Sequence, residues 1–353
     1  MVRMGAAILC GLVGLQGCRP ESEGRASLVD GPRVLAIRST PAEAQPDTKV
    51  TFEALFVGPT EAPDPKGLQW ALCNVPKPIA VEGPIAPACL SLGGVALTSL
   101  GQGATATGLI PKDVCRVFGP APPEPEPGQP SLRPADPDTT GGYYQPVRIA
   151  YSVGADAEYA TGVTRLACGI GGATQAQAAD FAQRHRPNAH PEIERVFLRR
   201  SDGSEVDATD ACDAGTLSVG SGESVSLRVA WAQCPLTPTC GDGICGARED
   251  GAGCPEDCSA PRGCTGAESY AAFDPASKQV VERREAVRVS WFATGGQFEH
   301  ERTGRGESDV GASDSEKGWV APGTPGEVRV WSVIRDDRGG VGWRVCRVTV
   351  AAR

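Results

Sequence analysis

The residues best suited to chemistry lie in a short cysteine-rich segment of the second half of the chain. Four cysteines fall within nineteen residues, at Cys240, Cys245, Cys254 and Cys258. Four carboxylates lie among them, at Asp242, Glu249, Asp250 and Asp257. So short and polar a segment cannot build a hydrophobic core, and we expect disulfides to close it. Hard oxygen ligands at this density make Ca²⁺ a candidate ligand, while the simpler interpretation is a disulfide knot with a solvated acidic face.

The N-terminus has the layout of a secretory signal peptide, with Arg3 ahead of an apolar run over residues 5–15. That run is too short to span a bilayer as a helix. It ends in Leu15-Gln16-Gly17-Cys18, which resembles the bacterial lipobox. The resemblance implies diacylglycerol on Cys18, cleavage before it, and acylation of the new N-terminus, with palmitate among the acyl chains. Several acyl chains anchor a protein stably. The alternative is an ordinary signal peptide with an incidental cysteine.

The remaining cysteines agree with export. The chain has 14 cysteines, of which Cys10 would be lost with the leader and Cys18 would carry the lipid. The other twelve form an even set, which an oxidising compartment turns into disulfides, and each half of the chain holds an even number. Zinc is disfavoured because exported thiols oxidise. Spacing leaves the connectivity open, and the candidates are Cys73, Cys89, Cys115, Cys168, Cys212, Cys234, Cys240, Cys245, Cys254, Cys258, Cys264 and Cys346.

Composition argues against several classes of function. The net charge is −9, which disfavours nucleic acid as a partner. Signatures of a nucleophile elbow, a zinc protease helix and a phosphate-binding loop are absent from the sequence. The chain has three histidines, His185, His190 and His300, and their spacing to other ligand types predicts solvated surface positions. A pair of carboxylates that hydrolyses a substrate stays open as a possibility, although only 5% of residues are aromatic.

Short alternating apolar runs, separated by Gly and Pro, predict an all-β chain. Residues 173–184 are the one good helix candidate, and residues 119–146, with nine prolines, predict an extended loop. Residues 335–340, with two Asp and two Gly between apolar runs, predict a hairpin turn. No βαβ rhythm is present, so β-sandwiches are expected. The predicted strands include residues 50–56, 68–73, 147–151, 163–168, 193–198, 223–231, 286–292, 326–334 and 343–350.

Both halves resemble the immunoglobulin-like (Ig-like) domains of myxobacterial lipoproteins. The resemblance lies in PRVLAIRSTPAEAQPDTKVTFEALFVGP, RPADPDTTGGYYQPVRI and GWVAPGTPGEVRVWSVIRDDRGGVGWRVCRVTV. The cysteine-rich segment resembles a C-G-[DN]-G-x-C…C-P-x-D-C repeat of exported surface proteins. These resemblances imply two Ig-like β-sandwich domains with a disulfide-rich insert in the second. The expected division is a signal peptide (1–17), a lipidated tether (18–30), domain 1 (31–170), a connector with a short helix (171–190), and domain 2 (191–353) with its insert (234–264).

We therefore expect a cell-envelope lipoprotein of the outer membrane, held to the membrane through Cys18. The expected role is non-catalytic: surface binding, adhesion or scaffolding, with an unidentified envelope protein or glycan as partner. No cofactor is expected beyond the candidate Ca²⁺, and no nucleic acid. Two alternatives stay open. One is a subunit of an envelope or secretion complex that pairs through an exposed sheet edge, and the other is an exported carboxylate-dependent hydrolase.

Overall fold

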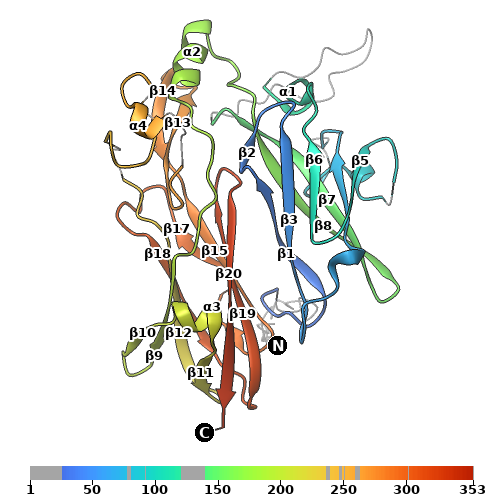
Figure 1. The fold of residues 1–353 in the computed structure, drawn as a ribbon, viewed down its shortest axis with the longest axis vertical. Coiled ribbons are helices and arrows are strands. Elements are labelled where there is room, and N and C mark those ends of the chain that lie inside the picture. Colours follow the sequence, from blue (N-terminus) through green and yellow to red (C-terminus); the bar gives the residue numbers. More distant parts are fainter. Residues whose placement is uncertain are drawn as a thin grey trace, which may run out of the picture.

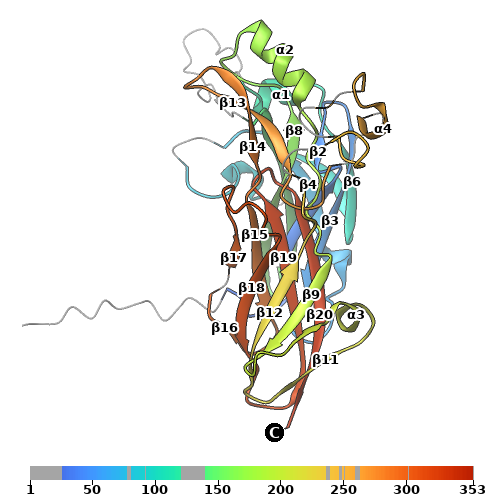
Figure 2. The same cartoon turned by 90° about the vertical axis from the view of Figure 1, so that its left-hand side faces the viewer.

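The computed structural model describes residues 26–77, 81–91, 93–120, 140–235, 239–245, 249, 251–258, 263–300 and 302–352. Cys18, Asp250, the leader and most of the Pro-rich segment lie outside these residues. The fold is all-β, with two Ig-like sandwiches side by side (Figures 1 and 2), which confirms the predicted fold class. Within the described ranges, no helix is long and apolar enough to cross a membrane.

The first sandwich packs a three-stranded sheet against a five-stranded one. The smaller sheet has the order β1 (Arg33–Thr40), β3 (Lys49–Val57) and β6 (Thr105–Leu109). The larger has the order β2 (Glu43–Ala44), β8 (Asp156–Ala167), β7 (Gly142–Val153), β4 (Gln69–Cys73) and β5 (Leu97–Gln102). The alternating residues that predicted strand 50–56 point inward, because the core contains Val50, Phe52, Trp70, Leu72, Val147 and Ile149. The loops between its strands contain the short helices η1 (Pro65–Gly67), η2 (Pro87–Cys89) and α1 (Val114–Phe118).

The second sandwich has two five-stranded sheets. One has the order β10 (Glu205–Asp207), β9 (Arg195–Arg200), β12 (Ser224–Ala230), β18 (Asp314–Val320) and β16 (Gln297–Phe298). The other has the order β11 (Leu217–Gly220), β20 (Val341–Ala351), β19 (Gly326–Asp336), β15 (Val287–Ala293) and β17 (Arg302–Arg305). Helix α3 (Thr209–Ala214) lies between β10 and β11 in sequence. The core contains Val225, Leu227, Val289, Trp291, Trp319 and Val348.

A separate hairpin was not anticipated from the sequence. Strands β13 (Ser269–Asp274) and β14 (Gln279–Arg284) pair only with each other and follow the cysteine-rich insert. Figure 1 shows the hairpin at one end of the molecule beside α2 (Gln175–Arg184) and α4 (Pro255–Cys258). Its sequence is weakly alternating and ends in the charged run Glu282–Glu285, which hid the strand signal.

All twelve candidate cysteines form disulfides, six in number. Cysteines of the first half pair with each other, and so do those of the second half, as the even count in each half suggested. The separation of 134 residues between Cys212 and Cys346 is the widest, and it joins α3 to β20. The pairs are Cys73–Cys89, Cys115–Cys168, Cys212–Cys346, Cys234–Cys264, Cys240–Cys254 and Cys245–Cys258.

The predicted helix at residues 173–184 is α2. Its first turn is closed by a capping box, in which the Thr174 side chain accepts from the Gln177 N–H and the Gln177 side chain accepts from the Thr174 N–H. The helix ends at His185, two residues before Pro187, which cannot continue it. The chain then passes between the two sandwiches as a connector.

The predicted tether is too long, because its last residues are docked. The N–H of Val29 donates to the carbonyl of Ala293 at 2.9 Å, and the N–H of Ala293 donates to the carbonyl of Ser27 at 2.9 Å. Val29 is fully buried. The prediction that the tether extends to residue 30 is therefore wrong for residues 27–29. An apolar pair, Leu28-Val29, inside the polar segment was the signal that sequence reasoning passed over.

Candidate functional site

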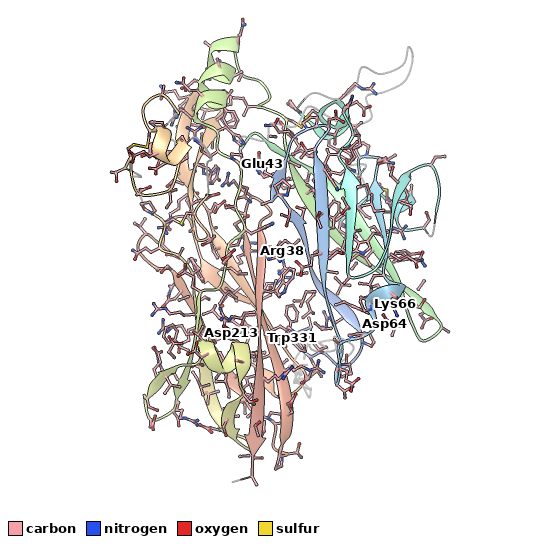
Figure 3. The ribbon with its side chains drawn as sticks, in the orientation of Figure 1. Arg38, Glu43, Asp64, Lys66, Asp213 and Trp331 are labelled. Atoms are coloured by element: carbon pink, nitrogen blue, oxygen red, sulfur yellow. A yellow bond between two sulfur atoms is a disulfide. The ribbon has the colours of Figure 1, made fainter. Side chains whose placement is uncertain are left out.

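The two sandwiches meet through an apolar face that neither could bury alone. In domain 1 it comprises Leu35 and Ala36 of β1 with Leu55 and Val57 of β3, joined by Val29. In domain 2 it comprises Phe292, Trp331, Val333, Val341 and Trp343. Figure 3 shows Trp331 between the strands of domain 2 and those of domain 1, and the residue is only 3% exposed. At the rim the Arg38 guanidinium lies 4.5 Å from the ring centre of Trp343, a cation–π arrangement.

Beside this face lies a largely buried set of charged and polar side chains, which we call the inter-domain ion cluster: Glu43, Arg165, His185, Asn188, Glu268, Glu285, Asp336 and Arg338. Glu43, on β2, is its domain 1 centre. It accepts hydrogen bonds from Arg165 Nε at 3.1 Å and the Asn188 N–H at 2.9 Å, and its other oxygen lies 2.8 Å from His185 Nε2. Burial alone would raise the pKa of Glu43, but the His185 hydrogen bond and the Arg165 charge lower it to about 2. Glu43 is therefore a buried carboxylate that β8 and the connector together hold in its charged form.

Arg338 is the domain 2 centre of the cluster and is 1% exposed. Its Nε donates to Glu285 at 2.6 Å, one Nη donates to Glu268, and the other donates to the carbonyl of Arg186 in the connector. Asp336 accepts from the N–H groups of Arg338 and Gly340, which closes the turn between β19 and β20. Burial raises the pKa of Glu285 well above its ordinary value and raises that of Asp336 as well.

His190 bridges the two domains directly. Its Nε2 lies 2.6 Å from the carbonyl oxygen of Ser39 on β1, and its Nδ1 accepts the N–H of Val341 on β20 at 3.0 Å. Since a carbonyl only accepts, Nε2 carries the proton and the ring is neutral. Burial lowers the pKa of His190, which favours this neutral form.

Two of the three histidines were therefore misplaced by sequence reasoning, while His300 is exposed as predicted. His185 and His190 were predicted at the solvated surface, but both are partly buried and each joins domain 1 to the connector or domain 2. The turn at residues 335–340 was predicted correctly, yet Asp336 and Arg338 point into the interface rather than into solvent. Partners more than 140 residues away, such as Glu43 for His185, leave no local pattern.

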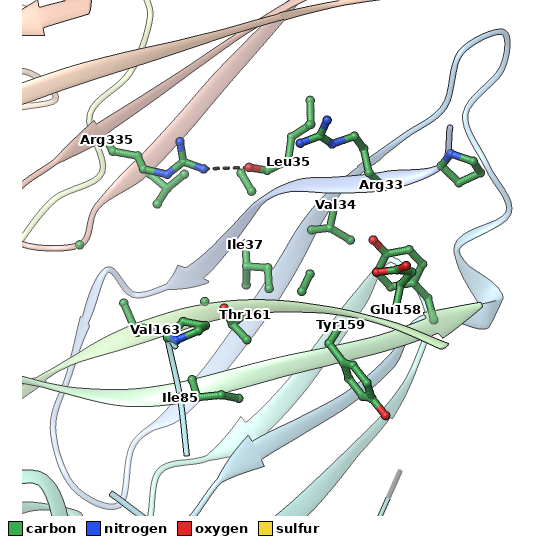
Figure 4. Close-up of a pocket in the computed structure, with 18 of the residues that line it drawn as sticks. Arg33, Val34, Leu35, Ile37, Ile85, Glu158, Tyr159, Thr161, Val163 and Arg335 are labelled. Atoms are coloured by element: carbon green, nitrogen blue, oxygen red, sulfur yellow. Dashed lines mark hydrogen bonds between the residues drawn. The ribbon is translucent and has the colours of Figure 1, made fainter. Parts of the chain in front are cut away.

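A cleft of about 710 Å³ opens at the side of this interface (Figure 4). Strand β1 forms one wall and β8 another, while the β19–β20 turn closes part of it. Arg335 crosses from that turn and donates to the Leu35 carbonyl at 2.8 Å (Figure 4). Tyr151 and Tyr159 give the domain 1 side an aromatic lining.

The cleft offers little to the hydrolase hypothesis. Its lining includes the carboxylates Asp30, Glu158 and Asp336, but Asp336 already accepts the hydrogen bonds of the turn. Asp30 and Glu158 are exposed to solvent. Among the described residues, no histidine or cysteine lines the cleft. The hydrolase alternative stays a prediction.

The cysteine-rich insert follows β12 and is closed at its base by Cys234–Cys264. Inside it, Asp257 accepts the N–H groups of Gly241 at 2.7 Å and Gly243 at 2.9 Å. Both glycines have positive φ, 95° and 82°, which lets successive N–H groups converge on one carboxylate. The glycines and the last Asp of the C-G-D-G…C-P-x-D-C motif therefore have a structural role, since they join its two halves beside the disulfides.

The candidate calcium ligands are not gathered around a common point among the residues described. Asp242 accepts the N–H groups of Thr239 and Ile244, and Asp257 is held by the two glycines. Asp250 lies outside the described residues. The one group of ligand atoms close enough for a metal in the described part consists of Cys240, Cys254 and Asp257, of which both cysteines are in a disulfide. Calcium binding at Asp242, Glu249, Asp250 and Asp257 stays a prediction.

No family model matches the chain, and no curated protein sequence matches it. Solved structures with some likeness include native Escherichia coli alpha-2-macroglobulin (9% identity, TM-score 0.22), whose alignment covers 91% of this chain and 17% of that one. Another is the C-terminal domain of the AgI/II polypeptide BspA of Streptococcus agalactiae (7%, TM-score 0.22, 91% and 96% covered). A chimeric titin Z1Z2 is a third (11%, TM-score 0.16, 92% and 99% covered). The chain spans less than a quarter of the macroglobulin chains, and likenesses this low carry no argument about function.

Proposed function

We propose that the chain is a lipid-anchored protein of the bacterial cell envelope whose two sandwiches form one rigid, non-catalytic support. The observation that carries the proposal is the sealed domain interface. It combines an apolar face, a buried ion cluster and a neutral histidine bridge. A flexible pair of domains would not hold Glu43 and Arg338 buried close together, because opening the interface would remove the Arg338 charge that helps to stabilise the Glu43 carboxylate.

The docked N-terminal residues support an anchor close to one end of the molecule. Leu28 bridges to Ala293, which pairs with Val330 near the start of β19. β20 ends beside this start, so the anchor side is the C-terminal end of domain 2. Only seven residues lie between Cys18 and Ala26, so a lipid on Cys18 holds that side within about 27 Å of the bilayer.

The opposite end is then the presented end. It carries the insert with α4, helix α2 and the β13–β14 hairpin (Figures 1 and 2). Arg184 joins two of these parts, since it donates to the Val280 carbonyl on β14 at 2.9 Å. Arg186 Nε approaches the Cys245 sulfur at 2.9 Å and attaches the insert to the connector. This end is a stapled, well-supported surface for contact with an envelope protein or glycan.

The anchoring is tested by comparing full-length protein with Cys18→Ser and with the matched leader variant Cys10→Ser in the native host. Metabolic labelling with palmitate should mark the wild type and Cys10→Ser but not Cys18→Ser. Cys18→Ser should also leave the membrane fraction. Unchanged membrane association of Cys18→Ser, or labelling that persists in it, would contradict the proposal.

A further inference from the structure

Strand β6 presents an unpaired edge on domain 1. It pairs with β3 alone, in an unbroken antiparallel register from Thr105 opposite Glu53 to Leu109 opposite Lys49. The carbonyl of Ala104 and the N–H of Ile110 form hydrogen bonds with the β3 segment. Because such bonds alternate along an antiparallel pair, the even-numbered residues of β6 are the ones whose main chain bonds to β3. Thr105, Thr107 and Leu109 therefore direct their main-chain groups away from β3, and among the described residues no main-chain hydrogen bond reaches them.

This edge lacks the charges that usually prevent strands from pairing. Residues 83–111 contain no Asp, Glu, Lys, Arg or His, in a chain that is 22% charged. Thr105 and Thr107 are exposed, and Leu109 is 59% exposed. Natural sheet edges are protected by charged side chains, prolines or bulges, so a flat edge without them favours strand addition.

The other edges of the described sheets are protected. Most carry charges, for example Glu205 on β10 and Arg302 on β17. On β11 the carbonyl of Ser218 is occupied by the Arg200 side chain. β16 has only two residues. β5 is also uncharged, but a register shift in its pairing with β4 interrupts the ladder at Leu100.

We propose that β6 pairs with β6 of a second copy of this chain, antiparallel and about a two-fold axis at Thr107. Two copies of a chain with a net charge of −9 repel each other over most of their surfaces. At the uncharged β6 edge, two copies can meet about a two-fold axis without placing like charges opposite each other. The pairing joins the two three-stranded sheets into one of six strands. It places Thr107 opposite Thr107, which is a favourable cross-strand pair, and Thr105 opposite Leu109, with no like charges opposed.

Cysteine cross-linking tests this register in the full-length, membrane-resident protein. The two copies of Thr107 form a hydrogen-bonded pair, whose Cα atoms are about 5.5 Å apart and thus within disulfide range. Thr107→Cys should therefore give a reducible dimer on non-reducing gels. Thr105→Cys is the matched control on the same face, because its two copies would be about 13 Å apart along the strands and should not cross-link.

A charge variant tests the interface without an added thiol. Thr107→Asp places two carboxylates opposite each other and should make the detergent-solubilised wild-type dimer monomeric in sedimentation equilibrium. Ser99→Asp, on the neighbouring uncharged β5, should leave the dimer intact. The proposal is overturned if the wild type is monomeric, if Thr105→Cys cross-links as well as Thr107→Cys, or if Ser99→Asp dissociates the dimer and Thr107→Asp does not. Cross-linking of Thr107→Cys only to a different protein also overturns it.

Discussion

Glu43 illustrates how one side chain connects distant parts of the chain. It lies on a two-residue strand of domain 1 and binds Arg165 of β8 together with His185 and Asn188 of the connector. Arg165 in turn donates to Thr140 and Tyr144, and Gly142 leaves the room that its guanidinium occupies. Removing the carboxylate would leave a buried cation without its partner, which costs far more than losing a surface ion pair.

Glu43→Gln should therefore lower the free energy of unfolding by about 3–5 kcal/mol, as measured by urea denaturation. Glu53→Gln is the matched control in the same domain, because its ion pair with Arg38 is partly exposed to solvent. That substitution should cost less than about 1 kcal/mol. Equal effects of the two substitutions would contradict the role assigned to the ion cluster.

His190 predicts a pH dependence with a defined sign. Its pKa is lowered in the folded protein by burial, so the folded state binds fewer protons than the unfolded state below the ordinary value of 6.5. Its contribution to stability is complete above that pH and is lost as the pH falls through and below it. Protonation would also place a proton on Nδ1, which accepts the Val341 N–H.

The measurement is the melting temperature of wild type and His190→Gln between pH 5 and 8. The difference between the two proteins should shrink as the pH falls below 6.5. His300→Gln, in an exposed loop, should keep the wild-type pH profile. A wild-type advantage over His190→Gln that grows on acidification would show that the ring is charged in the folded state.

At the scale of elements, residue patterns along the chain predicted those strands and helices that depend mainly on neighbouring residues. Alternating apolar residues predicted β3, β4, β7, β12 and β19, and a run of helix formers limited by Pro187 predicted α2. The even cysteine count predicted the disulfides within each half but not the partners, since pairing depends on the folded chain. The β13–β14 hairpin was missed because its alternation is weak. The turn at Asp336–Gly340 was found, but its inward direction depends on domain 1.

In the insert, substitution of Asp257 should impair disulfide formation more than substitution of its neighbour Glu256. Asp257→Asn keeps the size of the side chain but sets an amide against the N–H groups of Gly241 and Gly243, which leaves a buried donor unpaired. Oxidative refolding should then give less of the Cys240–Cys254 and Cys245–Cys258 pairing, read by peptide mapping. Glu256→Gln, an exposed neighbour, should refold like the wild type. Normal pairing in Asp257→Asn would contradict this role.

At the scale of the whole molecule, the domain interface is the feature that the sequence concealed most completely. Its apolar residues, such as Leu35 and Trp331, belong to strands that also supply a domain core, so their outward-facing members look like ordinary strand residues. Its ionic residues come from β2, β8, the connector, the two ends of the β13–β14 hairpin and the β19–β20 turn, and Glu43 lies more than 100 residues from both Arg165 and His185. These residues come together only in the folded chain. Periodicity in the sequence therefore predicted two sandwiches but not the interface between them.

Trp331→Ala should uncouple the two sandwiches. Truncating this buried ring should lower the free energy of unfolding by about 3–5 kcal/mol. The lost contacts are those between the domains, because Trp331 packs in the inter-domain face and not in either core. Calorimetry should then resolve two unfolding transitions where the wild type has one. Trp70→Ala, in the core of domain 1, should lower the stability of that domain without increasing the distance between domains. A single unchanged transition in Trp331→Ala would contradict the coupling.

The rigid union of the two domains is tested most directly by a distance between them in solution. Spin labels on non-cysteine amino acids at Lys66 of domain 1 and Glu327 of domain 2, both exposed, leave the disulfides intact. Pulsed electron paramagnetic resonance should give one narrow distance distribution in the wild type and a broad one in Trp331→Ala. A broad distribution in the wild type would mean that the domains move independently, and it would contradict the account of this protein as one rigid support.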